Sequence, residues 1–191
     1  VPSVRAHRAT QNRRRTDHRH GDLFRLAQLN GRLQLIEVIA RLDWPPDWVP
    51  KPDWVPVSFR TRQNVPPADL GLYARFVAET VRHFQGRVHF YQVWNEPNLA
   101  REWNGLVPDP VGYVELLRAC YIGIKTADPE ALVISAGLSP TGSGPPGALP
   151  DVDYLVEMYE AGAAPYFDLL GLNAPGYKAP PELSPDEAAD Q

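Results

Sequence analysis

Two kinds of segment alternate along the chain. Short, nearly continuous apolar runs, rich in β-branched and aromatic residues, alternate with longer segments whose apolar residues recur every three or four positions. The first kind is typical of buried parallel strands, and the second is typical of amphipathic helices. The pattern therefore predicts strands at 33–42, 88–94, 131–136 and 167–173, with helices at 69–85, 110–126 and 151–161 between them.

Individual residues mark the ends of the predicted helices. Gly86 follows the helix at 69–85, and glycine readily takes the left-handed conformation that ends helices. Pro110 opens the next helix, where the missing N–H of proline costs nothing. Asp151 is a candidate cap for the helix at 151–161 because an aspartate at that position can accept from free backbone N–H groups.

The order strand, helix, strand, helix, strand, helix, strand predicts an α/β fold with a parallel sheet. Two architectures share this order, an open doubly wound sheet and a closed (β/α)8 TIM barrel. No Gly-x-Gly-x-x-Gly follows a predicted strand, which argues against a dinucleotide-binding sheet. A complete barrel needs about 250 residues, so a barrel formed by these 191 residues would be partial.

Composition and charge divide the chain into two parts. With 43% hydrophobic and 22% charged residues, the composition is typical of a globular domain. Residues 1–20 hold six Arg and one Asp, a net charge of +5, which leaves −9 for the rest. We expect a basic leader of uncertain structure over 1–30 and a barrel domain over 31–191.

The basic leader admits two interpretations. Such an arm could bind nucleic acid, but no aromatic residue interleaves with its arginines to stack on bases. A disordered or foreign leader is therefore favoured, and we expect no nucleic-acid partner. No apolar run is long enough to cross a membrane, so we expect no membrane partner either. The compartment stays open.

The residues that usually bind metals do not form a site in the sequence. Cys120 is the only cysteine, and its place in a helical pattern predicts a buried, inert thiol. The five histidines lack the spacing of metal ligands. No serine has a nucleophile elbow or an ordered Ser-His-Asp set around it. We therefore expect neither a metal nor an organic cofactor.

The strongest chemical signal is Val-Trp-Asn-Glu-Pro-Asn at 93–98. An apolar strand runs directly into Asn95 and Glu96, and Pro97 ends it. Partial burial at the end of such a strand raises the pKa of a carboxyl group, which is what a general acid requires near neutral pH. The alternative is an ordinary solvated glutamate. The motif favours catalysis, with Asn95 binding a sugar hydroxyl.

These residues resemble clan A of the glycoside hydrolases, whose fourth barrel strand ends in Asn-Glu and often Asn-Glu-Pro. The resemblance extends over about 33–190 and looks closest to families 39 and 5. It implies that the strands at 33–42, 88–96, 131–136 and 167–173 are barrel strands three to six. It also implies a retaining mechanism by two glutamates, with Glu96 as the acid/base and a nucleophile at the end of strand seven.

Several aromatic and polar side chains are candidates for holding the sugar. Trp44, Trp48 and Trp54 lie in one Pro-rich loop, which is either a sugar platform or a self-packed cover of the barrel end. Trp103 follows Glu96 and has the same two interpretations. Trp94 either stacks on sugar or belongs to the core. Four further residues follow predicted strands: Asn173 and Tyr177 are candidates for substrate contact, while Arg41 and Asp43 either line the pocket or pair with each other.

The sequence departs from the clan because strands one, two and seven are not recognisable and no glutamate other than Glu96 ends a predicted strand. The others fall in predicted helices or loops: Glu102, Glu115, Glu130, Glu157, Glu160, Glu182 and Glu187. We therefore expect a hydrolase acting on O-glycosyl bonds of an oligosaccharide, polysaccharide or glycoside, with the nucleophile absent from this chain. The alternative is a catalytically inactive barrel or fragment that binds carbohydrate.

Overall fold

The computed structural model describes residues 37–53, 64–175, 180 and 182–184. Its helices and strands belong to one compact unit, Ile39–Gln191. The expected leader at 1–30 and the first part of the predicted strand at 33–42 lie outside the described residues, so both stay predictions.

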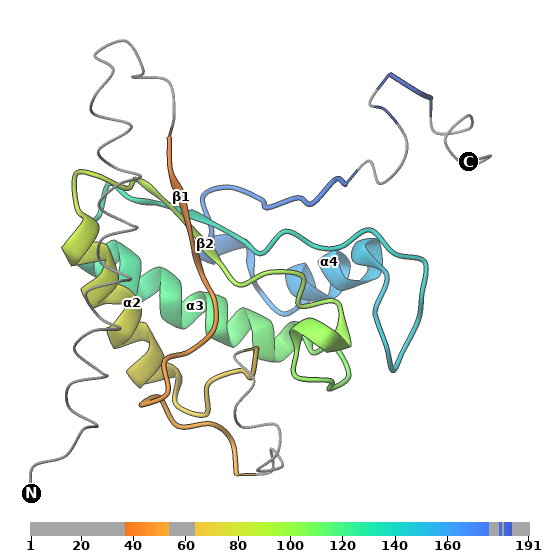
Figure 1. Ribbon diagram of the computed structural model, residues 1–191, viewed down its shortest axis with the longest axis horizontal. Helices are drawn as coiled ribbons and strands as arrows, with labels where there is room; N and C mark the ends of the chain where they lie inside the picture. Colours follow the sequence, from red (N-terminus) through yellow and green to blue (C-terminus); the bar gives the residue numbers. More distant parts are fainter. Residues whose placement is uncertain (1–36, 54–63, 176–179, 181, 185–191) are drawn as a thin grey trace, which may run out of the picture. The chain divides into compact units, whose positions relative to one another are not determined.

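A three-stranded parallel sheet forms the centre of this unit (Figure 1). Its strands are β1 (Ile39–Leu42), β2 (Phe90–Val93) and β3 (Leu132–Ile134), in the same order as in the chain. Arg41 lies opposite Gln92, and Gln92 lies opposite Ile134. The predicted parallel α/β class is confirmed, although each strand is shorter than predicted. A barrel and one half of an open sheet both have this strand order.

The fourth predicted strand, 167–173, is wrong as a strand. One isolated bridge joins it to β3, between Ile134 and Leu169, and a second joins it to the loop after β3, between Leu138 and Leu172. Side chains take hydrogen bonds that a backbone ladder would use. The Asp168 carboxylate accepts from Val133 N at 2.8 Å, and Ser135 Oγ accepts from Gly171 N at 2.9 Å. The apolar run predicted the position of this segment beside β3 but not its irregular backbone.

The three predicted helices are present with small shifts at their ends. They are α2 (Leu70–Phe84), α3 (Pro110–Ala127) and α4 (Asp151–Glu160). Asp69 and Asp109 cap the first two through their carboxylates, which accept from Leu72 N and Gly112 N. Gly86, with φ of 73°, follows the end of α2 as predicted.

The predicted cap of α4 is wrong. Pro150 holds the cap position, and Asp151 is the first residue of the helix. The Asp151 carboxylate instead accepts from Thr141 N at 3.4 Å, in the loop after β3. An acidic residue in the first turn still interacts favourably with the positive end of the helix dipole. Two short 3-10 turns complete the described elements, η2 (Ala100–Glu102) and η3 (Ala164–Tyr166).

The helices pack against one another and cover one face of the sheet. Helix α2 packs on α3, and α3 packs on α4; in Figure 1 strand β1 crosses in front of α3. Tyr91 and Val93 are buried, and Val93 O accepts from Tyr113 Oη of α3 at 3.1 Å. Alternate residues on the other face are more open, and Ile39 is 56% exposed. Within the described residues, no helix combines the length and the apolar character needed to span a bilayer.

Candidate active site

The backbone turns sharply where β2 ends. Trp94 has φ of 69° and Glu96 has φ of 44°, both in the left-handed region that residues with side chains seldom adopt. Such conformations persist only where the surrounding structure holds them, and they gather at functional sites. Two of them within three residues indicate that this turn is held in place to direct Asn95 and Glu96.

Neighbouring segments hold the turn through the backbone. Trp94 N donates to Leu42 O, and Glu96 N donates to Gly137 O, both at 3.0 Å. These bonds connect the turn to the end of β1 on one side and to the loop after β3 on the other. The carboxyl ends of three parallel strands therefore fix the position of Glu96.

Trp94 belongs to the core. Its side chain is 1% exposed, its indole Nε1 donates to Glu102 O at 3.0 Å, and its ring packs edge-on against Trp103 with 5.6 Å between centroids. A buried indole with a satisfied N–H has no face available for a sugar. The core interpretation of Trp94 holds, and the residue supports the turn that carries Glu96.

The Glu96 carboxylate accepts hydrogen bonds at both oxygens. Asn173 Nδ2 donates to Oε1 at 3.0 Å, and Arg101 Nη2 donates to Oε2 at 3.2 Å. The Glu96 side chain is only 15% exposed. Asn173 Nδ2 also lies 3.3 Å from Asn95 Oδ1. The structure thus brings together three of the residues that the sequence nominated, across nearly 80 positions of chain.

Gly137 makes the approach of Asn173 possible. A Cβ at position 137 would overlap the Asn173 side-chain amide oxygen, and it would lie 3.2 Å from Asn173 N. Gly137 O also accepts from Glu96 N. A residue without a side chain is needed here because two backbone segments and a polar side chain meet at one point.

A group of charges surrounds Glu96 at the rim. At the end of β1, Arg41 Nε and Asp43 Oδ2 pair at 2.6 Å, which favours the paired interpretation of these two residues. Arg101 Nε lies 3.6 Å from Glu102 Oε1. Burial raises the pKa of Glu102, and the nearby charge of Glu96 raises it further. Burial also raises the pKa of Asp43, against the lowering effect of Arg41.

Sequence reasoning missed Arg101 and Glu102 as members of the site. Both lie in η2, and the turn at Trp94 folds this short helix back beside Glu96. Their only signal in the sequence was closeness to the motif. Glu102 does not end a strand, yet it lies near enough to Glu96 for the charge of Glu96 to raise the pKa of Glu102, in addition to the larger effect of burial.

Asn98 has a structural role that the motif did not reveal. It is fully buried, its Nδ2 donates to Ser139 O and Leu149 O, and its Oδ1 accepts from Ser139 N. These bonds join the loop after β2 to both ends of the loop after β3. The second Asn of the motif therefore holds the rim together, while Asn95 lies beside Glu96.

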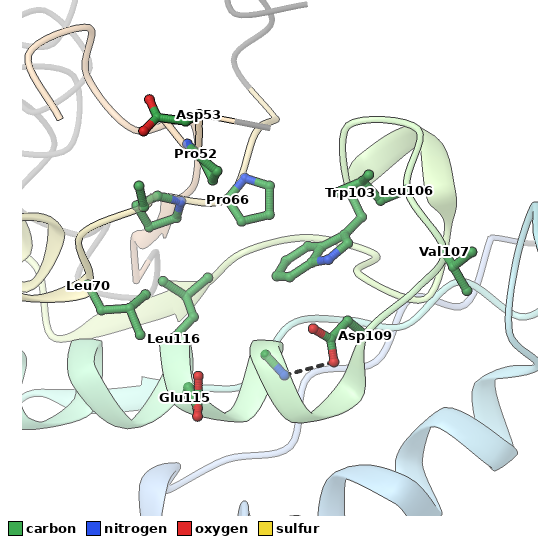
Figure 2. Close-up of a pocket in the computed structure, with 13 residues that line it drawn as sticks. Pro52, Asp53, Pro66, Leu70, Trp103, Leu106, Val107, Asp109, Glu115 and Leu116 are labelled. Atoms are coloured by element: carbon green, nitrogen blue, oxygen red, sulfur yellow. Dashed lines mark hydrogen bonds between the residues drawn. The ribbon is translucent and has the colours of Figure 1, made fainter. Parts of the chain in front are cut away.

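The nominated tryptophans lie in two different settings. Trp44 and Trp48 are 52% and 59% exposed, and Trp48 packs edge-on against Phe76. Trp103 is 4% exposed. It borders a pocket of about 890 Å³, whose other lining residues come from 52–53, 66–70, 106–109 and the first half of α3 (Figure 2). That pocket does not include Glu96. Trp54 and Tyr177 lie outside the described residues.

Within the part of the chain that the structure describes, no group of His, Cys, Asp or Glu is arranged to hold a metal ion. Cys120 is buried, as predicted, and burial raises the pKa of its thiol far above the usual range. A thiol that stays protonated is a poor nucleophile and a poor metal ligand. The chemistry of the described site therefore rests on carboxylates, guanidinium groups and amides.

Comparison with known proteins finds glycoside hydrolases among solved structures. The chain is similar to a family 39 glycoside hydrolase from Bacteroides cellulosilyticus, with 28% identity and a TM-score of 0.40 over 56% of this chain and 20% of that one. It is similar to a family 39 β-xylosidase from Caulobacter crescentus, with 24% identity and a TM-score of 0.42 over 58% of this chain and 24% of that one.

A monomeric β-xylosidase from Caulobacter crescentus gives 26% identity and a TM-score of 0.40 over 59% of this chain and 22% of that one. The chain thus spans between a fifth and a quarter of the length of these proteins. No protein-family model matches the sequence, and neither does any curated protein. At this level of structural overlap, the function has to be argued from the site itself.

Proposed function

We propose that this chain forms part of a (β/α)8 barrel that cleaves glycosidic bonds with retention of configuration, and that Glu96 is its acid/base. The observation that carries the proposal is the position of Glu96. Its carboxylate is largely buried at the carboxyl end of a parallel strand, on a strained turn held from both neighbouring strands. Catalytic groups of barrel enzymes occupy such strand ends.

The surroundings of Glu96 suit the proposed chemistry. In the first step, Glu96 protonates the glycosidic oxygen while a second carboxylate attacks the anomeric carbon and expels the leaving group. In the second step, Glu96 removes a proton from the water that releases the sugar. Asn173 orients the carboxylate through Oε1, and Asn95 is placed to accept from a sugar hydroxyl. Trp44 and Trp48 are exposed indoles that can stack on sugar rings.

The nucleophile is the part of the proposal that the described residues do not supply. A retaining pair requires carboxyl groups about 5–5.5 Å apart, each at the end of a strand. Glu96 is the only glutamate of the described strands in that position, and Glu102 lies in the same loop system rather than across the sheet. We therefore propose that the attacking carboxylate belongs to a strand outside the described residues.

A small external nucleophile tests the role of Glu96 without that carboxylate. Azide can attack the anomeric carbon of an aryl glycoside, so that a glycosyl azide forms and the aryl alcohol leaves with a proton. We expect azide-dependent release of phenol from phenyl β-xyloside by the full chain. Because general acid catalysis contributes about 10²–10⁴-fold, Glu96→Gln should slow this release by about that factor.

The leaving group provides the matched control. 2,4-Dinitrophenolate leaves without a proton, so Glu96→Gln should hardly change azide-dependent release from the dinitrophenyl glycoside. Glu79→Gln removes an exposed carboxylate on α2, far along the chain from the site, and should change neither rate. Equal rates for wild type and Glu96→Gln on the phenyl substrate would contradict the proposed role.

A second candidate function is carbohydrate binding without turnover. One observation favours it: both oxygens of Glu96 already have hydrogen-bond donors, so the group is held in the form that accepts protons. In that case xylo-oligosaccharides should quench the fluorescence of the chain's tryptophans in a saturable way. No glycosyl azide should form with any leaving group, and Glu96→Gln should bind as well as wild type.

A further inference from the structure

The hydrogen bonds of Glu96 describe one protonation state. Arg101 Nη2 and Asn173 Nδ2 can only donate, and each occupies one carboxylate oxygen. An ionised carboxylate accepts at both oxygens, whereas a protonated one must use one oxygen to donate. The arrangement is therefore that of the base. In the acid form, the oxygen that carries the proton is a weaker acceptor and directs its O–H elsewhere, so the donor at that oxygen is held less strongly.

Of the two donors, Arg101 is the one that can move. Asn173 is held from the other side by its closeness to Gly137 and to Asn95. The Arg101 side chain is 72% exposed, and its Nε already lies 3.6 Å from Glu102 Oε1. A rotation of the exposed guanidinium away from Glu96 would thus leave it beside a second carboxylate instead of without a partner.

We propose that Arg101 is a positioning residue that acts as a displaceable counter-ion of Glu96, with Glu102 as its second partner. In the empty site, Arg101 holds Glu96 as the carboxylate. When a glycoside enters, Arg101 turns to Glu102, and Oε2 becomes free to carry the proton toward the glycosidic oxygen. The pairing follows from the contacts themselves, while its meaning for catalysis rests on the proposed function.

Other charges near Glu96 are already paired or distant. Arg41 and Asp43, from the end of β1, pair with each other. From the segment 167–173 beside β3, Asp168 pairs with Lys125 of α3 at 2.9 Å. Among the described residues, η2 is therefore the element that brings a charged partner, Arg101, to Glu96. Burial, and next the charge of Glu96, raises the pKa of Glu102.

Titration of the carboxyl carbons by NMR tests the proposal in the full chain, without any substrate. The Glu96 signal is assigned from its loss in Glu96→Gln. In Arg101→Gln, we expect the titration midpoint of Glu96 to move to higher pH than in wild type, and Arg101→Lys should restore part of the difference. In Glu102→Gln, the midpoint should move to lower pH, because Arg101 then has Glu96 as its remaining partner.

The guanidinium signal of Arg101 reports the second partner directly. In Glu96→Gln, its side-chain N–H groups should shift as Glu102 titrates, and this dependence should vanish in the double variant with Glu102→Gln. Arg82→Gln, which breaks an exposed pair with Glu79 on α2, is the control and should leave Glu96 unchanged. An unchanged Glu96 midpoint in Arg101→Gln, or an Arg101 signal indifferent to Glu102, would overturn the proposal.

The two proposals can fail separately. If the midpoint moves as expected but Glu96→Gln does not slow phenol release, the proposed role of Arg101 is supported and the proposed glycosidase function is contradicted. If Glu96 is required for phenol release but its titration midpoint does not change in Arg101→Gln, the proposed glycosidase function is supported and the proposed role of Arg101 is contradicted.

Discussion

The face of strand β2 that packs on the helices and the rim beyond its carboxyl end differ in what stabilises them. On the side that faces the helices, Tyr91 and Val93 are buried, and the Tyr113 hydroxyl of α3 donates to Val93 O and accepts from Ala136 N. Two residues later, the rim holds a strained turn and paired charges, with half-exposed indoles nearby. The helix side gains stability from packing and from the hydrogen bonds of the Tyr113 hydroxyl. That stability holds the strained conformation of the rim in place.

Trp94 is where the two regions meet, and its removal should have the largest effect. Trp94→Ala leaves a large cavity beside Trp103 and removes the bond to Glu102 O. We expect a loss of about 3–5 kcal/mol in the free energy of unfolding, measured by urea denaturation. Trp48→Ala, at a 59% exposed indole, should cost under about 1 kcal/mol. Similar losses for both would show that the rim tryptophans are as much part of the core as Trp94.

A smaller effect is expected from one hydroxyl on the helix side. Tyr113→Phe keeps the ring but leaves Val93 O and Ala136 N without this partner. Because each buried group without a partner costs about 1–3 kcal/mol, we expect a loss of about 2–4 kcal/mol in urea unfolding. Tyr73→Phe is the matched control, since the buried Tyr73 hydroxyl has no hydrogen-bond partner among the described residues. That variant should be as stable as wild type or more stable, and a loss equal to that of Tyr113→Phe would contradict this account.

At the rim, Gly137→Ala should cost less stability and change the site more. The new methyl overlaps the Asn173 amide, so we expect about 1–2 kcal/mol of overpacking strain and displacement of Asn173 from Glu96. Thermal unfolding of Gly137→Ala, Asn173→Ala and the double variant gives the coupling between the two positions. The cost of the methyl should shrink in the Asn173→Ala background, and strict additivity would show that the two positions do not interact.

The smallest effect is the dependence of stability on pH that Glu102 brings. Burial, and next the charge of Glu96, raise its folded-state pKa above the ordinary value of 4.5. The folded chain therefore binds this proton more tightly than the unfolded chain, and stability falls as the pH rises from about 4.5 through the raised pKa. Glu102→Gln should flatten part of that fall in urea titrations between about pH 4 and 7. An unchanged slope would mean that Glu102 is not buried in the way described.

The helices could be predicted well because their signals are local. Gly86 and Pro110 act within one helical turn, and the spacing of apolar residues identifies the buried face without knowledge of its partner. The segment 167–173 could not be predicted in the same way. Whether an apolar run pairs along its length depends on competing donors and acceptors, and here Asp168 and Ser135 side chains take that role.

By itself, the sequence predicted the α/β class of the fold, the order of its helices and of three strands, and the residue at the centre of the candidate site. Apolar periodicity and the end of an apolar strand at Asn95 and Glu96 are properties of neighbouring residues, so they can be read along the chain. Only the tertiary structure decided that Trp94 and Trp103 are both buried. It also decided that Asn173 reaches Glu96 and that Arg101 lies between Glu96 and Glu102. Those contacts arise because parallel strands bring their carboxyl ends to one edge, where residues far apart in sequence meet.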